Sequence, residues 1–174
     1  MSTAALASAR TSAAPFEVSK KLERAIDQVI THYPQKRSAT MMVLHALQEH
    51  FGYLSPEAIE WTAAKLSLQP INVYELVTFY PMFRQQPVGK HHLRICRTLS
   101  CALAGACELR EHLCRKLGLD PSGQGAQTTG DGRFTVEFVE CLASCGTGPV
   151  LMCNDSFHES VSAEQADRIV GRCK

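Results

Sequence analysis

Two pairs of closely spaced cysteines are the residues of this sequence best suited to chemistry. Cys96 and Cys101 are separated by four residues, and Cys141 and Cys145 by three. Each pair begins at the end of a segment with the alternating pattern of a β-strand. Two such strand ends side by side in one sheet can present four thiolates to one point, as a metal ion or an iron–sulfur cluster requires.

The spacing of these cysteines leaves two kinds of metal centre open. A [2Fe–2S] cluster takes four thiolates, two for each iron, and the two pairs meet that need. A structural zinc site with four cysteines also fits, although its spacers are usually shorter. A thioredoxin-type dithiol is disfavoured because the sequence contains no Cys-x-x-Cys. Four buried cysteines without a shared partner are disfavoured because both pairs lie at strand ends.

The other cysteines and the nearby histidines are expected to have no part in this centre. We interpret four cysteines as structural or incidental: Cys107, Cys114, Cys153 and Cys173. Cys107 and Cys114 lie seven residues apart on one helix face, which favours core packing. His91 and His92 are interpreted as surface residues at the start of a strand, because four cysteines already complete a ligand set. Glu137 is expected on a solvated face, and Glu140, beside Cys141, is a candidate for contact with a partner.

Composition and charge exclude several classes of protein. The chain has 174 residues, 45% of them hydrophobic and 20% charged, with a formal net charge of +1. These values describe a globular protein without the basic excess that nucleic-acid binding requires. No apolar run approaches the roughly 20 residues that span a bilayer. Residues 1–15 lack the apolar core of a signal peptide and are expected to form a disordered tail, so the eight cysteines are not expected to form a disulfide framework.

The order of the expected elements suggests two domains joined by a polar segment. The periodicity of apolar residues predicts helices over residues 18–30, 40–51 and 56–66, and a short fourth element over 70–83 that Pro81 breaks. Residues 84–90 are polar and contain Pro and Gly, which marks a boundary. Beyond it, the pattern predicts a β-α-β-β-α order, with strands at 91–96, 134–139 and 150–153, a possible return strand at 157–161, and helices at 104–117 and 163–172. The expected domains are 16–86, a helical bundle, and 87–174, a small sheet with helices packed on it.

The motifs and their order resemble those of one protein family. The segments that carry the resemblance are Val-Tyr-Glu-Leu-Val-Thr-Phe-Tyr-Pro-Met-Phe at 73–83, Pro-Val-Gly-Lys-His at 87–91, the Cys96/Cys101 pair, Asp-Gly-Arg-Phe-Thr-Val at 131–136, and Val-Glu-Cys-Leu-Ala-Ser-Cys at 139–145. They are similar to the E-subunit family of NADH:quinone oxidoreductase, respiratory complex I. The resemblance implies an α+β fold, with an N-terminal helical bundle followed by a thioredoxin-like [2Fe–2S] ferredoxin domain. It also implies that Cys96, Cys101, Cys141 and Cys145 hold one [2Fe–2S] cluster.

The resemblance further implies a role as one subunit of a larger redox complex. The expected partner is the flavoprotein subunit that binds FMN and NADH, so the chain itself is expected to bind neither. The expected location is the peripheral arm of a membrane-bound complex, on the cytoplasmic side of the inner membrane, without insertion into it. The same family includes subunits of NAD-linked hydrogenases and formate dehydrogenases, which stay open as an alternative. A zinc-stapled interaction module is the alternative from another class. The aromatic residues Phe79, Tyr80 and Phe83 are expected in the core or at a subunit interface.

Overall fold

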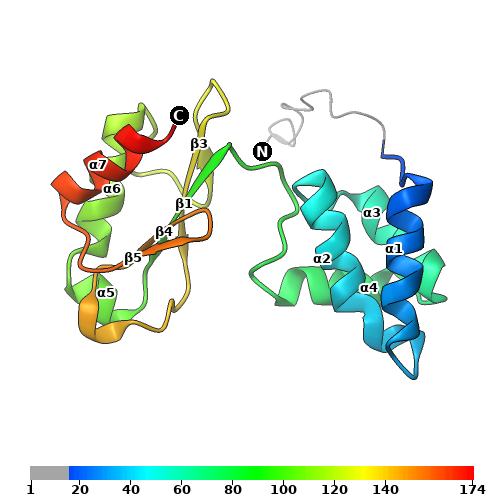
Figure 1. Ribbon diagram of the computed structural model, residues 1–174. Coiled ribbons are helices and arrows are strands. Elements are labelled where there is room, and N and C mark those ends of the chain that lie inside the picture. Colours follow the sequence, from blue (N-terminus) through cyan, green and yellow to red (C-terminus); the bar gives the residue numbers. More distant parts are fainter. Residues whose placement is uncertain (1–15) are drawn as a thin grey trace, which may run out of the picture. The chain divides into compact units, whose positions relative to one another are not determined.

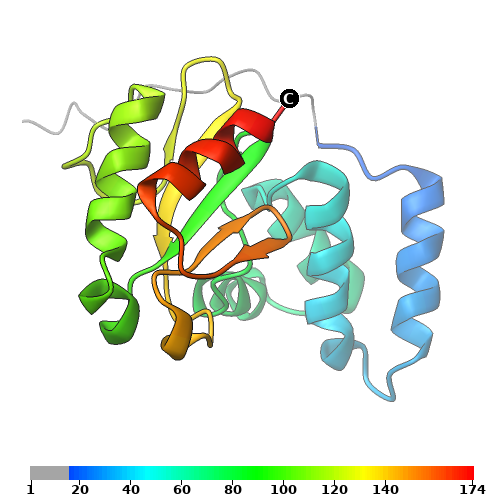
Figure 2. The same ribbon diagram turned by 60° about the vertical axis from the view of Figure 1, so that its left-hand side comes forward.

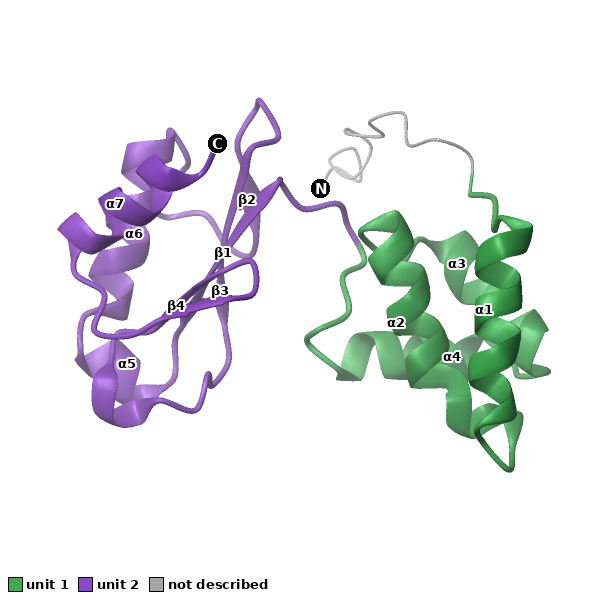
Figure 3. Cartoon of the chain, viewed as in Figure 1, with its two compact units in different colours: residues 1–85 green, residues 86–174 purple. Residues whose placement is uncertain are grey.

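The computed structural model describes residues 16–174 in two compact units, which divide between Gln85 and Gln86 (Figure 3). Each unit has its own core of buried apolar side chains. The expectation of a disordered tail at residues 1–15 lies outside the described residues. In the described part of the chain, no helix is both long enough and apolar enough to cross a lipid bilayer.

The first unit is built from helices (Figure 1). They are α1 (Lys20–Thr31), α2 (Thr40–Phe51), α3 (Pro56–Leu66) and α4 (Pro70–Phe79), with a 3₁₀ turn at Lys36–Ala39. Local signals set several boundaries. The side chains of Ser19 and Ser55 accept hydrogen bonds from N–H groups in the first turns of α1 and α3. Gly52 ends α2 with a φ of +82°, a backbone conformation that few other residues adopt without strain.

The predicted range of the second helix, residues 40–51, is confirmed, although no side chain caps its first turn. The chain enters α2 through the 3₁₀ turn, and the Thr40 hydroxyl donates to the Arg37 carbonyl at 2.6 Å. Helix α4 ends at Phe79, shortly before Pro81, the residue expected to break it. Tyr80 adopts an extended backbone, as expected for a residue that precedes a proline.

The second unit contains one five-stranded sheet with the strand order β2-β3-β1-β4-β5. The strands are β1 (His91–Cys96), β2 (Gln127–Thr128), β3 (Phe134–Val139), β4 (Leu151–Cys153) and β5 (Ser156–His158). The helices are α5 (Leu99–Leu103), α6 (Ala106–Leu117) and α7 (Ala163–Arg172). Helices α6 and α7 lie side by side on one face of the sheet (Figures 1 and 2). The helical unit followed by a mixed unit agrees with the predicted α+β class.

The pairing of the strands brings distant segments to one edge of the sheet. Strands β1 and β3 are parallel neighbours, with Cys96 opposite Val139, so both strands end at the same level. Strand β4 runs antiparallel on the other side of β1, with Leu151 opposite Ile95. The segments that carry the two cysteine pairs therefore leave the sheet at the same end.

Two expectations about polar residues and one about a cysteine are wrong. His92 is buried, with 4% of its surface exposed, and its Nε2 lies 2.7 Å from Glu137 Oε1. Glu137 is therefore the partner of a buried histidine and does not belong to a fully solvated face. Cys114 is in the core, as expected, but Cys107 is exposed in the first turn of α6.

Candidate metal centre at the end of the sheet

Cys96 and Cys101 form the buried half of the candidate site. Cys96 is the last residue of β1, and its N–H donates to the Val150 carbonyl at 3.1 Å. Cys101 lies in the short helix α5, which begins after Thr98 and turns the chain back toward the strand end. Both cysteines are 2% exposed. The sequence did not predict α5, because the expected helix began only at residue 104.

Burial and neighbouring polar groups move the pKa values of these two thiols in opposite directions. Burial acts to raise the pKa of Cys96, but the Thr98 hydroxyl, 3.2 Å from Cys96 Sγ, and the N–H groups of Leu142 and Thr98 outweigh it and lower that pKa. Burial first, and then the adjacent Cys96 thiol, raises the pKa of Cys101. The sulfurs of Cys96 and Cys101 are thus close neighbours, but hydrogen-bond donors together dominate the pKa of the first and burial dominates that of the second.

Cys141 and Cys145 form the exposed half of the site. Cys141 lies two residues beyond the end of β3, and Cys145 begins a 3₁₀ turn at Cys145–Thr147. The N–H of Ala143 donates to Cys141 Sγ at 3.2 Å, and Ala143 has a φ of +60°. This turn contacts α5, and the charge of Cys145 influences Cys101. The structure therefore brings the second pair to the first.

Two further residues shape this region: Gly148, one of the small residues that follow the second cysteine pair in the sequence, and Glu159, which nothing in the sequence singles out. A Cβ atom on Gly148 would lie 3.1 Å from Ala104 Cβ and 3.5 Å from Cys101 Sγ, so the close approach of the chain to Cys101 depends on glycine. Glu159 binds the hydroxyls of Ser144 and Thr147, the latter at 2.5 Å, and those hydroxyls lower its pKa. Glu159 thereby braces the turn that carries Cys145. No local pattern in the sequence links Glu159 to the cysteines.

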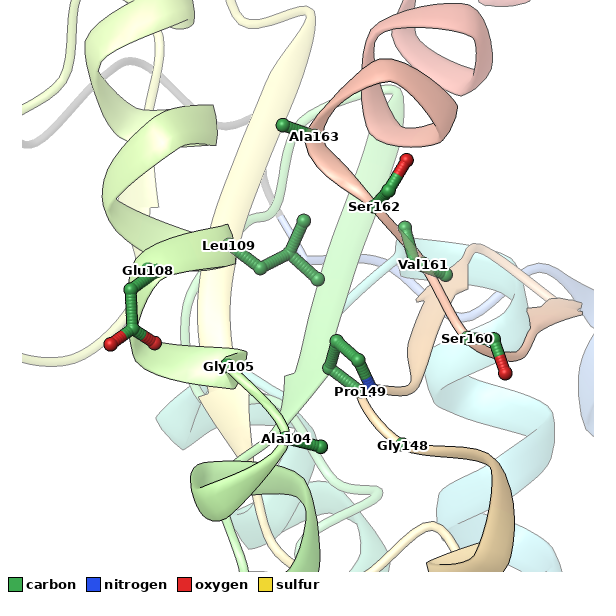
Figure 4. Close-up of a pocket in the computed structure, with 10 residues that line it drawn as sticks. All are labelled: Ala104, Gly105, Glu108, Leu109, Gly148, Pro149, Ser160, Val161, Ser162 and Ala163. Atoms are coloured by element: carbon green, nitrogen blue, oxygen red, sulfur yellow. The ribbon is translucent and has the colours of Figure 1, made fainter.

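An open pocket lies beside the buried pair (Figure 4). It has a volume of about 360 Å³ and is lined by residues between the α5–α6 junction and the start of α7: Ala104, Gly105, Glu108, Leu109, Gly148, Pro149 and Ser160–Ala163. Leu109 points from α6 toward the strand behind it, and Glu108 points away from Leu109. Gly148, which lines the pocket, also lies against Cys101.

The arrangement of the sulfurs tests which metal centre they fit. A tetrahedral zinc ion with Zn–S bonds of about 2.3 Å places its four sulfurs about 3.8 Å apart. Within residues 16–174, the only three ligand-type residues with their ligand atoms all within 4.8 Å of one another are His91, Cys153 and Cys173, in another part of the unit. The four cysteine sulfurs therefore do not converge on a single ion. A cluster with two irons does not require such convergence, because each iron takes two of the four thiolates.

Comparison with known proteins decides the family. The thioredoxin-like [2Fe-2S] ferredoxin family matches residues 26–174. The chain belongs to this family. It is 36% identical over 149 residues to the E 2 subunit of NADH-quinone oxidoreductase from Rhizobium meliloti (strain 1021), a match that covers 86% of each chain. It is 40% identical over 132 residues to NADH-quinone oxidoreductase subunit 2 of Thermus thermophilus, covering 75% of this chain and 71% of the relative.

These relatives confirm the resemblance to the E-subunit family and the predicted fold class. Among solved structures, a chain of the NAD⁺-reducing [NiFe]-hydrogenase in its air-oxidised state has a TM-score of 0.62 and 23% identity. The match covers 75% of the present chain but only 22% of that chain, and it supports the fold alone. The assignment of the four cysteines as ligands stays a prediction.

Proposed function

We propose that this chain is the electron-transfer subunit of an NADH:quinone oxidoreductase complex. One [2Fe–2S] cluster held by Cys96, Cys101, Cys141 and Cys145 would exchange single electrons with FMN in the NADH-binding partner subunit. The observation that carries the proposal is the juxtaposition of the two cysteine pairs at the adjacent ends of β1 and β3. Relatives from NADH-quinone oxidoreductase at more than 30% identity support the same assembly.

The chain's own residues would hold and tune the centre. When bound, a [2Fe–2S] cluster supplies one-electron redox chemistry. The thiolates of the four cysteines bind the irons, and the Thr98 hydroxyl and the Ala143 N–H donate to two of the sulfurs. Such hydrogen bonds stabilise negative charge on sulfur and tune the reduction potential.

The surface around the site is suited to a protein partner. Cys141 and Cys145 are exposed, whereas Cys96 and Cys101 are buried, so electrons would pass through the exposed half. Leu99 and Leu103 flank Cys101 on α5 and are 74% and 81% exposed. Apolar side chains this exposed next to a redox site are typical of a surface that a partner covers.

The aromatic residues near the end of the first unit were expected either in the core or at a subunit interface, and the structure places them differently from one another. Phe83 is in the core, whereas Phe79 is 76% exposed at the end of α4. The interface role is therefore proposed for Phe79 alone.

Substitution of single cysteines tests this function. Cys101→Ser replaces a thiolate by a hydroxyl, which ligates iron poorly, and we expect loss of the cluster or a grossly altered paramagnetic signal. Cys114→Ala, the control, removes a core sulfur at a cost of about 1 kcal/mol and should leave the cluster intact. Iron and acid-labile sulfide, about two of each per chain in the unaltered protein, would be measured for both variants.

The alternatives give different results in the same preparation. Stoichiometric zinc without labile sulfide at the four cysteines would contradict the proposal and favour a zinc-stapled interaction module. A subunit of an NAD-linked hydrogenase or formate dehydrogenase would carry the same cluster. The proteins that purify with the chain distinguish this alternative from the proposed complex. A hydrogenase or formate dehydrogenase would contain a nickel–iron or molybdenum subunit in place of quinone-reducing membrane subunits.

A further inference from the structure

A second group of ligand-type side chains lies in the sheet unit, away from the four cysteines. His91 begins β1, Cys153 ends β4, and Cys173 follows α7. One ligand atom from each of these residues lies within 4.8 Å of the other two, and all three residues are half-buried. The sulfurs of Cys153 and Cys173 are 3.7 Å apart.

The fold explains why these three residues meet. Because β4 runs antiparallel to β1, with Cys153 opposite Leu93, Cys153 lies level with the start of β1. Alternate residues of a strand share a face, so His91 lies on the same face as Leu93. Leu93 and α7 belong to one core, and the end of α7 brings Cys173 to this end of the sheet (Figure 1).

The group is separate from the four-cysteine site. His91 and Cys96 are the first and last residues of β1. Five steps of about 3.3 Å along a strand place them roughly 16 Å apart. The same strand therefore carries one group of ligand atoms at each end, and a change in one group need not disturb the other.

The separation of the two sulfurs fits a tetrahedral metal better than a disulfide. Sulfurs bound to one zinc ion are about 3.8 Å apart, whereas the sulfurs of a disulfide are about 2.05 Å apart. The observed 3.7 Å is that of two thiols in contact; it is already close to the first value, whereas a disulfide would need the sulfurs to approach by about 1.6 Å. An imidazole takes no part in a disulfide, whereas in a metal site His91 can supply the third ligand atom.

Two of the three side chains, His91 and Cys173, make contacts in the metal-free chain. His91 Nε2 lies 3.2 Å from the main-chain oxygen of Lys174, and the imidazole packs on the Phe134 ring with 5.3 Å between centroids. The Cys173 S–H donates to the Ile169 carbonyl at 3.3 Å, a bond that is given up when the thiol loses its proton to bind a metal. Metal-binding histidines commonly have such a second partner, which orients the ring.

We propose that His91, Cys153 and Cys173 bind a zinc ion, with the fourth position open to water. On binding, the two S–H bonds break, two Zn–S bonds form, and two protons pass to solvent without any transfer of electrons. The ion would join the end of α7 to the start of β1 and the end of β4. It would act as a structural staple, independent of the redox centre.

Metal analysis of single variants of the full chain tests the site. The protein would be kept reduced, and zinc and iron would be measured together. We expect about one zinc per chain in addition to the cluster iron. Cys153→Ala, Cys173→Ala and His91→Gln should each lose that zinc and keep the iron. Cys107→Ala, which removes an exposed cysteine of the same unit, should keep both metals.

Cobalt gives a second readout for the same variants. Co²⁺ exchanged into the chain should show the absorption of tetrahedral thiolate ligation, and Cys153→Ala should abolish it. An unchanged circular dichroism spectrum separates loss of a ligand from unfolding. The proposal fails if the unaltered chain binds no more cobalt than Cys153→Ala. It also fails if the reduced chain carries no zinc and exposure to air links Cys153 and Cys173 by a disulfide. A third contradicting result would be zinc that is lost in Cys101→Ser but kept in Cys153→Ala.

Discussion

The hydroxyl of Thr98 is a contact of the candidate centre that can be removed with little change in volume. It lies 3.2 Å from Cys96 Sγ and, against a thiolate, acts as the donor. A donor to sulfur favours the more negative, reduced state, so Thr98→Val should lower the reduction potential. A net hydrogen bond of about 0.5–1.5 kcal/mol corresponds to a shift of about 20–60 mV for one electron. A potentiometric titration monitored by the paramagnetic signal measures this shift.

The control for Thr98→Val is Thr78→Val, which removes a hydroxyl that bonds main-chain carbonyls within α4. This change should leave the potential as it is. A potential that stays constant or rises in Thr98→Val would contradict the proposed ligand role of Cys96.

Gly148 and Gly146 form a matched pair for testing how tightly the chain packs against Cys101. A Cβ on Gly148 would lie 3.1 Å from Ala104 Cβ, whereas a Cβ on Gly146 would meet nothing within 4 Å. Gly148→Ala should therefore reduce the iron content and the free energy of unfolding, the latter by about 1–3 kcal/mol, as overpacking does. Gly146→Ala should change neither. Equal effects of the two substitutions on iron content and urea unfolding would show that the close approach to Cys101 is unimportant.

At the scale of single residues, the sequence indicated the cysteine pairs but not the contacts that support them. The pairs are recognisable because short spacing and strand ends are local features. Gly148 is recognisable in the sequence only as a small residue near the second pair, and its approach to Cys101, like the contacts of Glu159, forms only in the folded chain. The same reason explains why His91, Cys153 and Cys173, far apart in the sequence, were interpreted separately as surface or incidental residues.

At the scale of elements, the contact between α6 and α7 includes an ion pair that should depend on pH. Asp167 Oδ1 lies 2.7 Å from His112 Nε2 and 3.2 Å from Lys116 Nζ. The hydrogen bond from His112, and then the contact with Lys116, lowers the pKa of Asp167 in the folded chain. Its ionised form therefore stabilises the fold above the ordinary aspartate pKa of about 3.9, and this contribution is lost as the pH falls through the lower, folded value.

Urea unfolding of the unaltered chain and of Asp167→Asn tests this dependence. The difference in free energy of unfolding should shrink as the pH falls from about 5 to below about 4. Both proteins carry the same cysteines, so any loss of iron in acid cancels in the difference. A difference that grows as the pH falls would contradict the assignment.

The elements that the sequence predicted well are those with strong local signals. Helix α7 was predicted to its ends because Ser162 and Gln165 form a capping box, and α3 because Ser55 and Pro56 start it. The missed elements are short: α5, β2 and the 3₁₀ turns. Such segments are too short to be stable alone and form only against the rest of the unit. Helix α6 begins later than predicted because Gly105, with a φ of +99°, turns the chain between it and α5.

At the scale of the whole molecule, the chain is expected to need a partner for activity. Its sequence has no glycine-rich nucleotide-binding motif, and its proposed centre handles only single electrons. The isolated protein, loaded with its cluster, should therefore not oxidise NADH with an artificial electron acceptor. Addition of the FMN-binding subunit should give activity, and Cys101→Ser should impair the complex. Turnover by the isolated chain, free of flavoprotein, would contradict this.

The division between Gln85 and Gln86 also has a consequence for biosynthesis. The first unit is complete in the nascent chain before any of the proposed cluster ligands has been made, and 60 further residues must be added after Gln85 to reach and include Cys145 (145 − 85). At the usual rates of translation, this distance takes on the order of 3–12 seconds. The helical unit can fold during that interval. Strand β1 cannot yet pair, because β3 and β4 have not been synthesised. On the proposed ligand set, cofactor insertion can be completed only after Cys145 has been made, so the machinery that delivers iron and sulfide meets a chain whose N-terminal unit has had time to fold.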